Sequence, residues 1–120
     1  MALVSINKKY KSMPALIDTG SDKTISYLEP WGKFFGITED DLEGEPTELT
    51  GLGGKKSNSY PLHVKLWIGD EMLNVPVYWI NTPYNEAVDN FPIILGRNII
   101  FKHFDVVFRE KDKKVYFYRR

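Results

Sequence analysis

The residues that could do chemistry most directly are Asp18, Thr19, Gly20 and Ser21, which follow the apolar run Ala15-Leu16-Ile17. An aspartate and a glycine after such a run predict a strand that ends in a tight turn carrying a carboxylate. Two carboxylates held close together share one proton, so one can accept a proton from water while the other donates. Only one such turn is present, so we expect a site shared between two copies of the chain.

The small residues of the turn each have an expected role. Gly20 leaves room for two turns to approach each other. Thr19 is expected to hydrogen-bond across the interface, and Ser21 to donate to the outer oxygen of the Asp18 carboxylate. The ionised carboxylate would deprotonate a water that attacks a peptide carbonyl, with no covalent intermediate, metal or other cofactor.

The elements that must position this turn are mostly strands. Leu62-His63-Val64-Lys65-Leu66-Trp67-Ile68 alternates strictly between apolar and polar residues, which is the strongest strand signal in the chain. Thr38, as an N-cap with Asp41 three residues later, predicts a brief helix, and a second short helix is expected within 97–103. Further strands are expected over 3–6, 13–17, 24–28, 75–80, 92–96, 104–108 and 115–118. Many short strands with glycine and proline between them indicate a mainly β barrel or sandwich.

Composition narrows the function further. With 120 residues the chain fits one domain, 1–120, and is too short for two lobes of ordinary size. Sixteen basic and sixteen acidic residues give no net charge, so neither nucleic acid nor an anionic membrane is favoured as a partner. There is no cysteine, leader-like segment or membrane-length apolar run. We expect a soluble, cytoplasmic protein.

Other residues with possible chemistry have simpler interpretations. His63 and His103 lack the spacing of a zinc site and are expected at the surface. The tryptophans, Trp31, Trp67 and Trp79, could line a peptide groove, but most are expected in the core.

A second motif, Ile93-Ile94-Leu95-Gly96-Arg97-Asn98, repeats the pattern of an apolar strand that ends in a glycine turn. Together with Leu16-Ile17-Asp18-Thr19-Gly20-Ser21-Asp22, in this order and at this separation, it resembles the retropepsin-like aspartic peptidases. The resemblance covers about 16–108 and is specific at the two motifs.

The resemblance implies a closed β barrel with a flap hairpin and one short helix in the C-terminal half. It implies that Asp18 is the catalytic aspartate, that Leu95 and Gly96 pack beside the catalytic turn, and that Asp22 and Arg97 form a structural ion pair. The tip of the flap, which would close over substrate, is assigned to Gly51, Leu52, Gly53 and Gly54. These glycines do not have the spacing of a phosphate-binding loop.

Three segments depart from the compact viral pattern, namely 31–46, 81–91 and the terminal hairpin 104–118. Cellular and microbial members with such a hairpin look more similar. The hairpin matters because viral members build much of their dimer interface from terminal strands.

The function expected is an aspartic endopeptidase that acts as a homodimer on extended peptide or protein substrates. Gly20 and Gly53 are expected to contact the substrate backbone. One alternative is a non-catalytic peptide-binding or dimerisation module on the same fold. Another is an unrelated β scaffold in which Asp18 only caps a turn.

Overall fold

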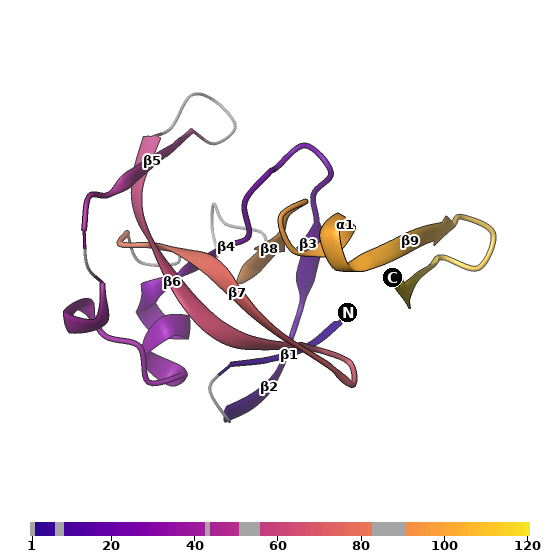
Figure 1. Cartoon of the computed structure of the whole chain (residues 1–120), viewed down its shortest axis with the longest axis horizontal. Coiled ribbons are helices and arrows are strands. Elements are labelled where there is room, and N and C mark those ends of the chain that lie inside the picture. Colours follow the sequence, from indigo (N-terminus) through magenta and orange to yellow (C-terminus); the bar gives the residue numbers. More distant parts are fainter. Residues whose placement is uncertain (1, 7–8, 43, 51–55, 83–90) are drawn as a thin grey trace.

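The computed structural model describes residues 2–6, 9–42, 44–50, 56–82 and 91–120. The strands are β1 (Ala2–Ile6), β2 (Lys9–Met13), β3 (Ala15–Ile17), β4 (Ile25–Tyr27), β5 (Thr47–Thr50), β6 (Lys56–Ile68), β7 (Glu71–Ile80), β8 (Ile93–Leu95), β9 (Phe104–Arg109) and β10 (Lys114–Arg119). Three short helical segments accompany them: η1 (Leu28–Gly32), η2 (Glu39–Asp41) and α1 (Ile100–His103). The mainly β fold expected from the sequence is confirmed (Figure 1).

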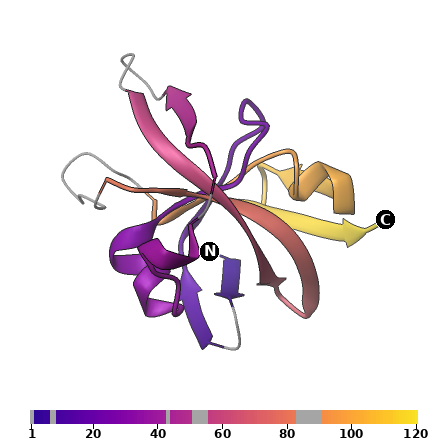
Figure 2. The ribbon, with the colours of Figure 1, turned by 60° about the vertical axis from the view of Figure 1, so that its left-hand side comes forward.

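The main sheet has eight strands, with β2-β1-β6-β7-β4-β8-β3 in order and β5 paired to β6 beside this path. It curls into a half-barrel, and the described residues form no ladder between the edge strands β2 and β3. Strands β9 and β10 make a separate antiparallel pair. Figure 2 shows the long strands β6 and β7 bending across the molecule, with β5 near one end of them.

The ladder between β6 and β7 supplies much of the core. It runs from Ser59 opposite Ile80 to Ile68 opposite Glu71. Because side chains alternate across a strand, every second residue faces inward, and the inward set is buried: Val64, Leu66, Ile68, Leu73, Val75, Val77 and Trp79. Each fully buried side chain of this kind stabilises the fold by about 1.5 to 3 kcal/mol.

The histidines and tryptophans were expected at the surface and mostly in the core, respectively. His63 is exposed on the outer face of β6, as expected, whereas His103 is half-buried at the end of α1. Trp79 is fully buried and Trp31 packs against the core, while Trp67 is half-buried. Two of the three tryptophans therefore contribute to the core, as expected for most of them.

The beginning of the chain differs from expectation at Pro14. One strand over 13–17 was expected, but the structure has β2 ending at Met13 and β3 starting at Ala15. Proline has no N–H to donate to a ladder, so the strand is interrupted at Pro14 and the segments on either side pair with different strands. Strand β2 pairs with β1, whereas β3 pairs in parallel with β8.

The short helices and the terminal hairpin agree with the sequence patterns. Thr38 caps η2, and its N–H donates to the Asp41 carboxylate at 2.8 Å. The helix expected within 97–103 is present as the four-residue α1. Strands β9 and β10 form the expected hairpin, which is attached to the core through Phe104.

Candidate active site

Asp18 follows directly after β3, where the two sequence motifs lie side by side. Strand β3 pairs in parallel with β8, so that Ile17 lies opposite Leu95. The pairing continues one step further, because the Asp18 N–H donates to the Leu95 carbonyl at 3.0 Å. The backbone that carries the carboxylate is therefore fixed to the second motif.

The carboxylate of Asp18 is held by its own turn. Its Oδ1 accepts a hydrogen bond from the Gly20 N–H at 2.9 Å, and the Asp18 carbonyl accepts one from the Ser21 N–H at 3.2 Å. A Cβ on Gly20 would lie 3.3 Å from Oδ1, which is tighter than nine in ten real contacts of a Cβ atom. Asp18 is half-buried, while Thr19 and Gly20 are exposed.

Ser21 does not have the role expected from the sequence. Its hydroxyl donates to the Lys23 carbonyl at 2.8 Å rather than to the Asp18 carboxylate, and it accepts the Lys23 N–H at 3.3 Å. A hydroxyl has only one proton to donate, so the bond to the Lys23 carbonyl leaves Ser21 no proton for the Asp18 carboxylate. Ser21 therefore shapes the loop after the turn.

Gly96 lies against the backbone of the loop that follows the Asp18 turn. A Cβ at Gly96 would lie 2.1 Å from the Lys23 carbonyl oxygen and 2.5 Å from the Lys23 carbonyl carbon. Both obstacles are backbone atoms, which cannot rotate away as a side chain can. Only glycine fits at this position without moving one motif away from the other.

Two more backbone hydrogen bonds join the motifs. The Arg97 N–H donates to the Ser21 carbonyl at 2.8 Å, and the Asn98 N–H donates to the Asp22 carbonyl at 3.1 Å. Together with the bond from Asp18 to Leu95, they join both ends of the Asp18 turn to the segment that begins at Leu95.

The expected ion pair between Asp22 and Arg97 is not formed in the structure. The Asp22 carboxylate instead lies 3.5 Å from the Lys23 Nζ, and both Asp22 and Arg97 are exposed. An exposed ion pair contributes only about 0 to 1 kcal/mol. The motifs are held together by backbone hydrogen bonds rather than by these side chains.

Thr24 makes contacts at the site that the sequence patterns did not predict. Thr24 is fully buried, and its hydroxyl accepts the Gly96 N–H and donates to the Asn98 Oδ1, each at 3.0 Å. The only local signal was a hydroxyl residue at the start of an apolar strand. Its partners lie more than 70 residues further along the chain, so the local pattern could not reveal them.

The residues assigned to the tip of the flap lie outside the described part of the chain. Gly51, Leu52, Gly53 and Gly54 are among the residues that the structure does not describe. The strands on either side form an antiparallel ladder that ends with Thr50 opposite Lys56.

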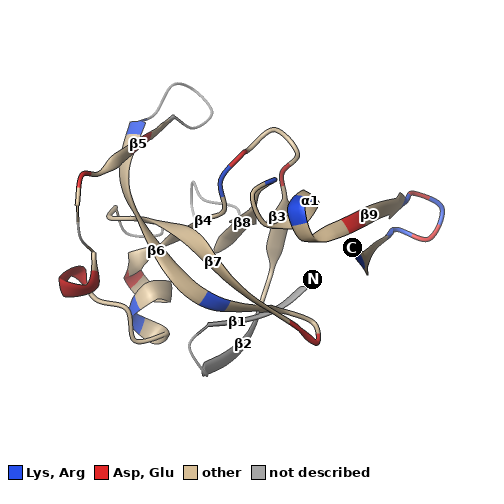
Figure 3. Ribbon diagram, viewed as in Figure 1, with Lys and Arg blue, Asp and Glu red and all other residues tan. Residues whose placement is uncertain are grey.

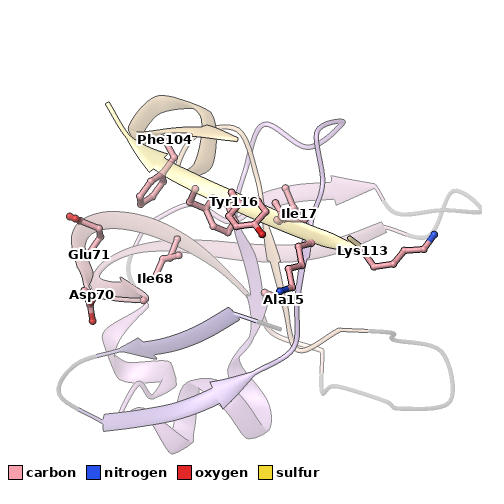
Figure 4. Close-up of a pocket in the computed structure, with 12 residues that line it drawn as sticks. Ala15, Ile17, Ile68, Asp70, Glu71, Phe104, Lys113 and Tyr116 are labelled. Atoms are coloured by element: carbon pink, nitrogen blue, oxygen red, sulfur yellow. The ribbon is translucent and has the colours of Figure 1, made fainter. Parts of the chain in front are cut away.

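A groove of about 730 Å³ lies beside β3, on the side of the C-terminal hairpin. Ala15 and Ile17 form one wall and Tyr116 lies opposite, while Asp70 and Lys113 lie toward opposite ends (Figure 4). Asp18 does not line this groove. The groove reaches Ile17, the residue before Asp18, but not the carboxylate itself.

Within the described ranges, no cluster of three histidine, aspartate or glutamate side chains could hold a metal ion. None of the helices in the described part of the chain has the length and apolar character needed to cross a bilayer.

Comparison with known proteins identifies the family. A search of curated proteins found no match. The family model described as retroviral aspartyl protease matches residues 1–104, a range that includes both motifs and the strands β3 and β8. The chain therefore belongs to the retroviral aspartyl protease family.

Proposed function

We propose that the protein is an aspartic endopeptidase that acts as a homodimer. The observation that carries the proposal is the Asp18 turn, whose backbone is bonded to Leu95 and whose carboxylate is half-buried, in a chain that belongs to this family. The described chain supplies one such turn. Two copies related by a two-fold axis would supply the second carboxylate.

The mechanism follows from the shared proton. The ionised Asp18 takes a proton from a water between the two carboxylates, and this water attacks the carbonyl carbon of the scissile peptide bond. The protonated Asp18 donates to the developing oxyanion. Rigid turns favour this step, because a carboxylate that is already oriented needs no rearrangement in the transition state.

The substrate is proposed to bind as an extended strand beneath the flaps. Main-chain hydrogen bonds would provide affinity, and side-chain pockets would provide selectivity. Gly20 is exposed beside the carboxylate and is proposed to contact the substrate backbone. Gly51, Leu52, Gly53 and Gly54 are proposed as the closing tip of the flap. Thr19 is proposed to bond across the dimer axis.

Replacement of Asp18 tests the proposal. Asp18→Asn keeps the oxygen that accepts the Gly20 N–H, so we expect the free energy of unfolding to change by less than about 0.5 kcal/mol. Cleavage of a peptide library should fall by about 10²- to 10⁴-fold, because the amide cannot exchange the proton. Wild-type cleavage should show a bell-shaped pH profile and be blocked by a statine-type transition-state mimic.

The control is Asp70→Asn, the same chemical change on the exposed turn between β6 and β7. It should leave the cleavage rate unchanged. Undiminished turnover by Asp18→Asn would refute the mechanism. Binding of peptides by the wild type without any cleavage would instead favour the non-catalytic alternative.

A further inference from the structure

Thr24 is a buried residue that the proposed chemistry does not use. It lies immediately before β4, and its side chain has no exposed surface. Its carbonyl accepts the Tyr78 N–H at 2.8 Å, which fixes its backbone to β7. Its hydroxyl is therefore presented from a rigid position.

The hydroxyl of Thr24 is fully committed to the second motif. It accepts the N–H of Gly96 at 3.0 Å and donates to the Oδ1 of Asn98 at 3.0 Å. Among the side-chain contacts described above, this is the one that reaches the peptide group between Leu95 and Gly96. Valine has nearly the same shape but can make neither bond.

The peptide group between Leu95 and Gly96 is held at both of its polar atoms. Its carbonyl accepts the N–H of Asp18 at 3.0 Å, and its N–H donates to Thr24. A peptide unit is planar, so its carbonyl and N–H cannot turn independently. The bond to Thr24 therefore sets the direction of the carbonyl that holds Asp18.

We infer that Thr24 is a positioning residue for the catalytic carboxylate, acting through the Leu95–Gly96 peptide group. The inference rests on the proposed function for its effect on catalysis, but its effect on the Asp18 backbone can be measured independently. Without the hydroxyl, the buried Gly96 N–H loses its acceptor and the peptide plane is free to tilt. The Asp18 carboxylate then leaves its productive geometry.

The kinetic test compares three variants. Thr24→Val removes the hydroxyl, whereas Thr24→Ser keeps it. Ser26→Ala is the matched control, because Ser26 is a buried hydroxyl residue on β4 whose proton goes to the Pro92 carbonyl at 2.8 Å and not to the second motif. Active sites are counted by titration with a statine-type inhibitor, so that partial unfolding does not lower the measured kcat.

We expect Thr24→Val to lower kcat by about 10- to 100-fold with little change in KM, the effect of a small misplacement of a catalytic group. Thr24→Ser should recover most of the rate, and Ser26→Ala should keep kcat while lowering the melting temperature. The two limbs of the pH profile of Thr24→Val should move closer together, because carboxylates that are further apart share their proton less strongly. Equal kcat for Thr24→Val and wild type would overturn the inference.

A measurement that needs no activity separates this inference from the proposed function. Amide hydrogen exchange of Asp18 should speed up by about tenfold or more in Thr24→Val, relative to the amide of Leu66 in the core. Thr24→Ser and Ser26→Ala should keep the wild-type ratio. An equal change at Asp18 and Leu66 would mean that Thr24 only stabilises the fold. A wild type that cleaves nothing would end the proposed function, while this ratio would still decide the role of Thr24.

Discussion

At the scale of single residues, the site depends on close packing around two glycines. Gly96 packs on the Lys23 backbone, and Gly20 leaves the Asp18 carboxylate free of a crowding Cβ. Lys23 is itself held in place, with its ammonium 5.6 Å from the centre of the Tyr78 ring. A larger residue at Gly96 would therefore push the loop after the Asp18 turn away from the second motif.

The residue-scale prediction concerns Gly96. We expect Gly96→Ala to lower the free energy of unfolding by about 3 kcal/mol, because the new Cβ overlaps backbone that cannot repack. The measurement is the midpoint of urea unfolding. The control is Asn74→Ala on the exposed face of β7, where nothing comparable is displaced. A Gly96→Ala protein as stable as the wild type would show that the two motifs can separate freely.

At the scale of elements, the terminal hairpin is attached to the body at one end only. Its inner face passes from Phe104, which is 2% exposed, to Phe108, which is 56% exposed. Phe104 packs edge-on against Phe117 with their ring centres 5.6 Å apart. The hairpin is thus anchored near α1 and extends away from the core (Figure 1).

The element-scale prediction uses these two phenylalanines as a matched pair. Phe104→Ala should cost about 3 to 5 kcal/mol of unfolding free energy, since it opens a cavity beneath the hairpin. Phe108→Ala, the same change four residues along the same strand, should cost less than about 1 kcal/mol, because its side chain is already largely in solvent. Equal losses in thermal unfolding of the isolated subunit would contradict this anchoring.

The elements also show what the sequence could predict. Alternation in 62–68 is a local signal, and it predicted β6 because one face of the strand is buried. The place of Asp18 beside Leu95 was implied by the resemblance of the two motifs to the retropepsin-like family, and the pairing of β3 with β8 agrees with it. The mainly β fold could therefore be predicted from local patterns, whereas the role of Asp18 stays a prediction.

The remaining features depended on tertiary geometry. The pairing of Asp22 with Lys23 rather than Arg97 is a choice among exposed side chains, where competing partners differ by little energy. The bond between Thr24 and Gly96 joins residues 72 positions apart. No periodicity or spacing encodes such a contact.

At the scale of the whole molecule, acidic and basic residues are both distributed along the described chain, and acidic residues cluster on η2 (Figure 3). The chain has no net charge, so two copies would not repel each other strongly. The described chain carries the Asp18 carboxylate on one turn. The proposed activity therefore belongs to a pair of subunits.

Mixing subunits tests this sharing. Adding an equal amount of Asp18→Asn protein should lower the activity of a fixed amount of wild type to about one half, because half of the wild-type subunits then have an inactive partner. A ninefold excess should leave about one tenth. Asp70→Asn protein added in the same amounts serves as the control. Activity that stays constant across the mixtures would show that each subunit works alone.

The parallel pairing of β3 with β8 also determines when the site can come into existence. During synthesis, Asp18 leaves the ribosome long before Leu95, the residue whose carbonyl fixes it. Until then β3 lacks its neighbour, and the carboxylate sits on an unanchored segment. A growing chain therefore cannot fix the proposed catalytic carboxylate in place until Leu95 has been translated.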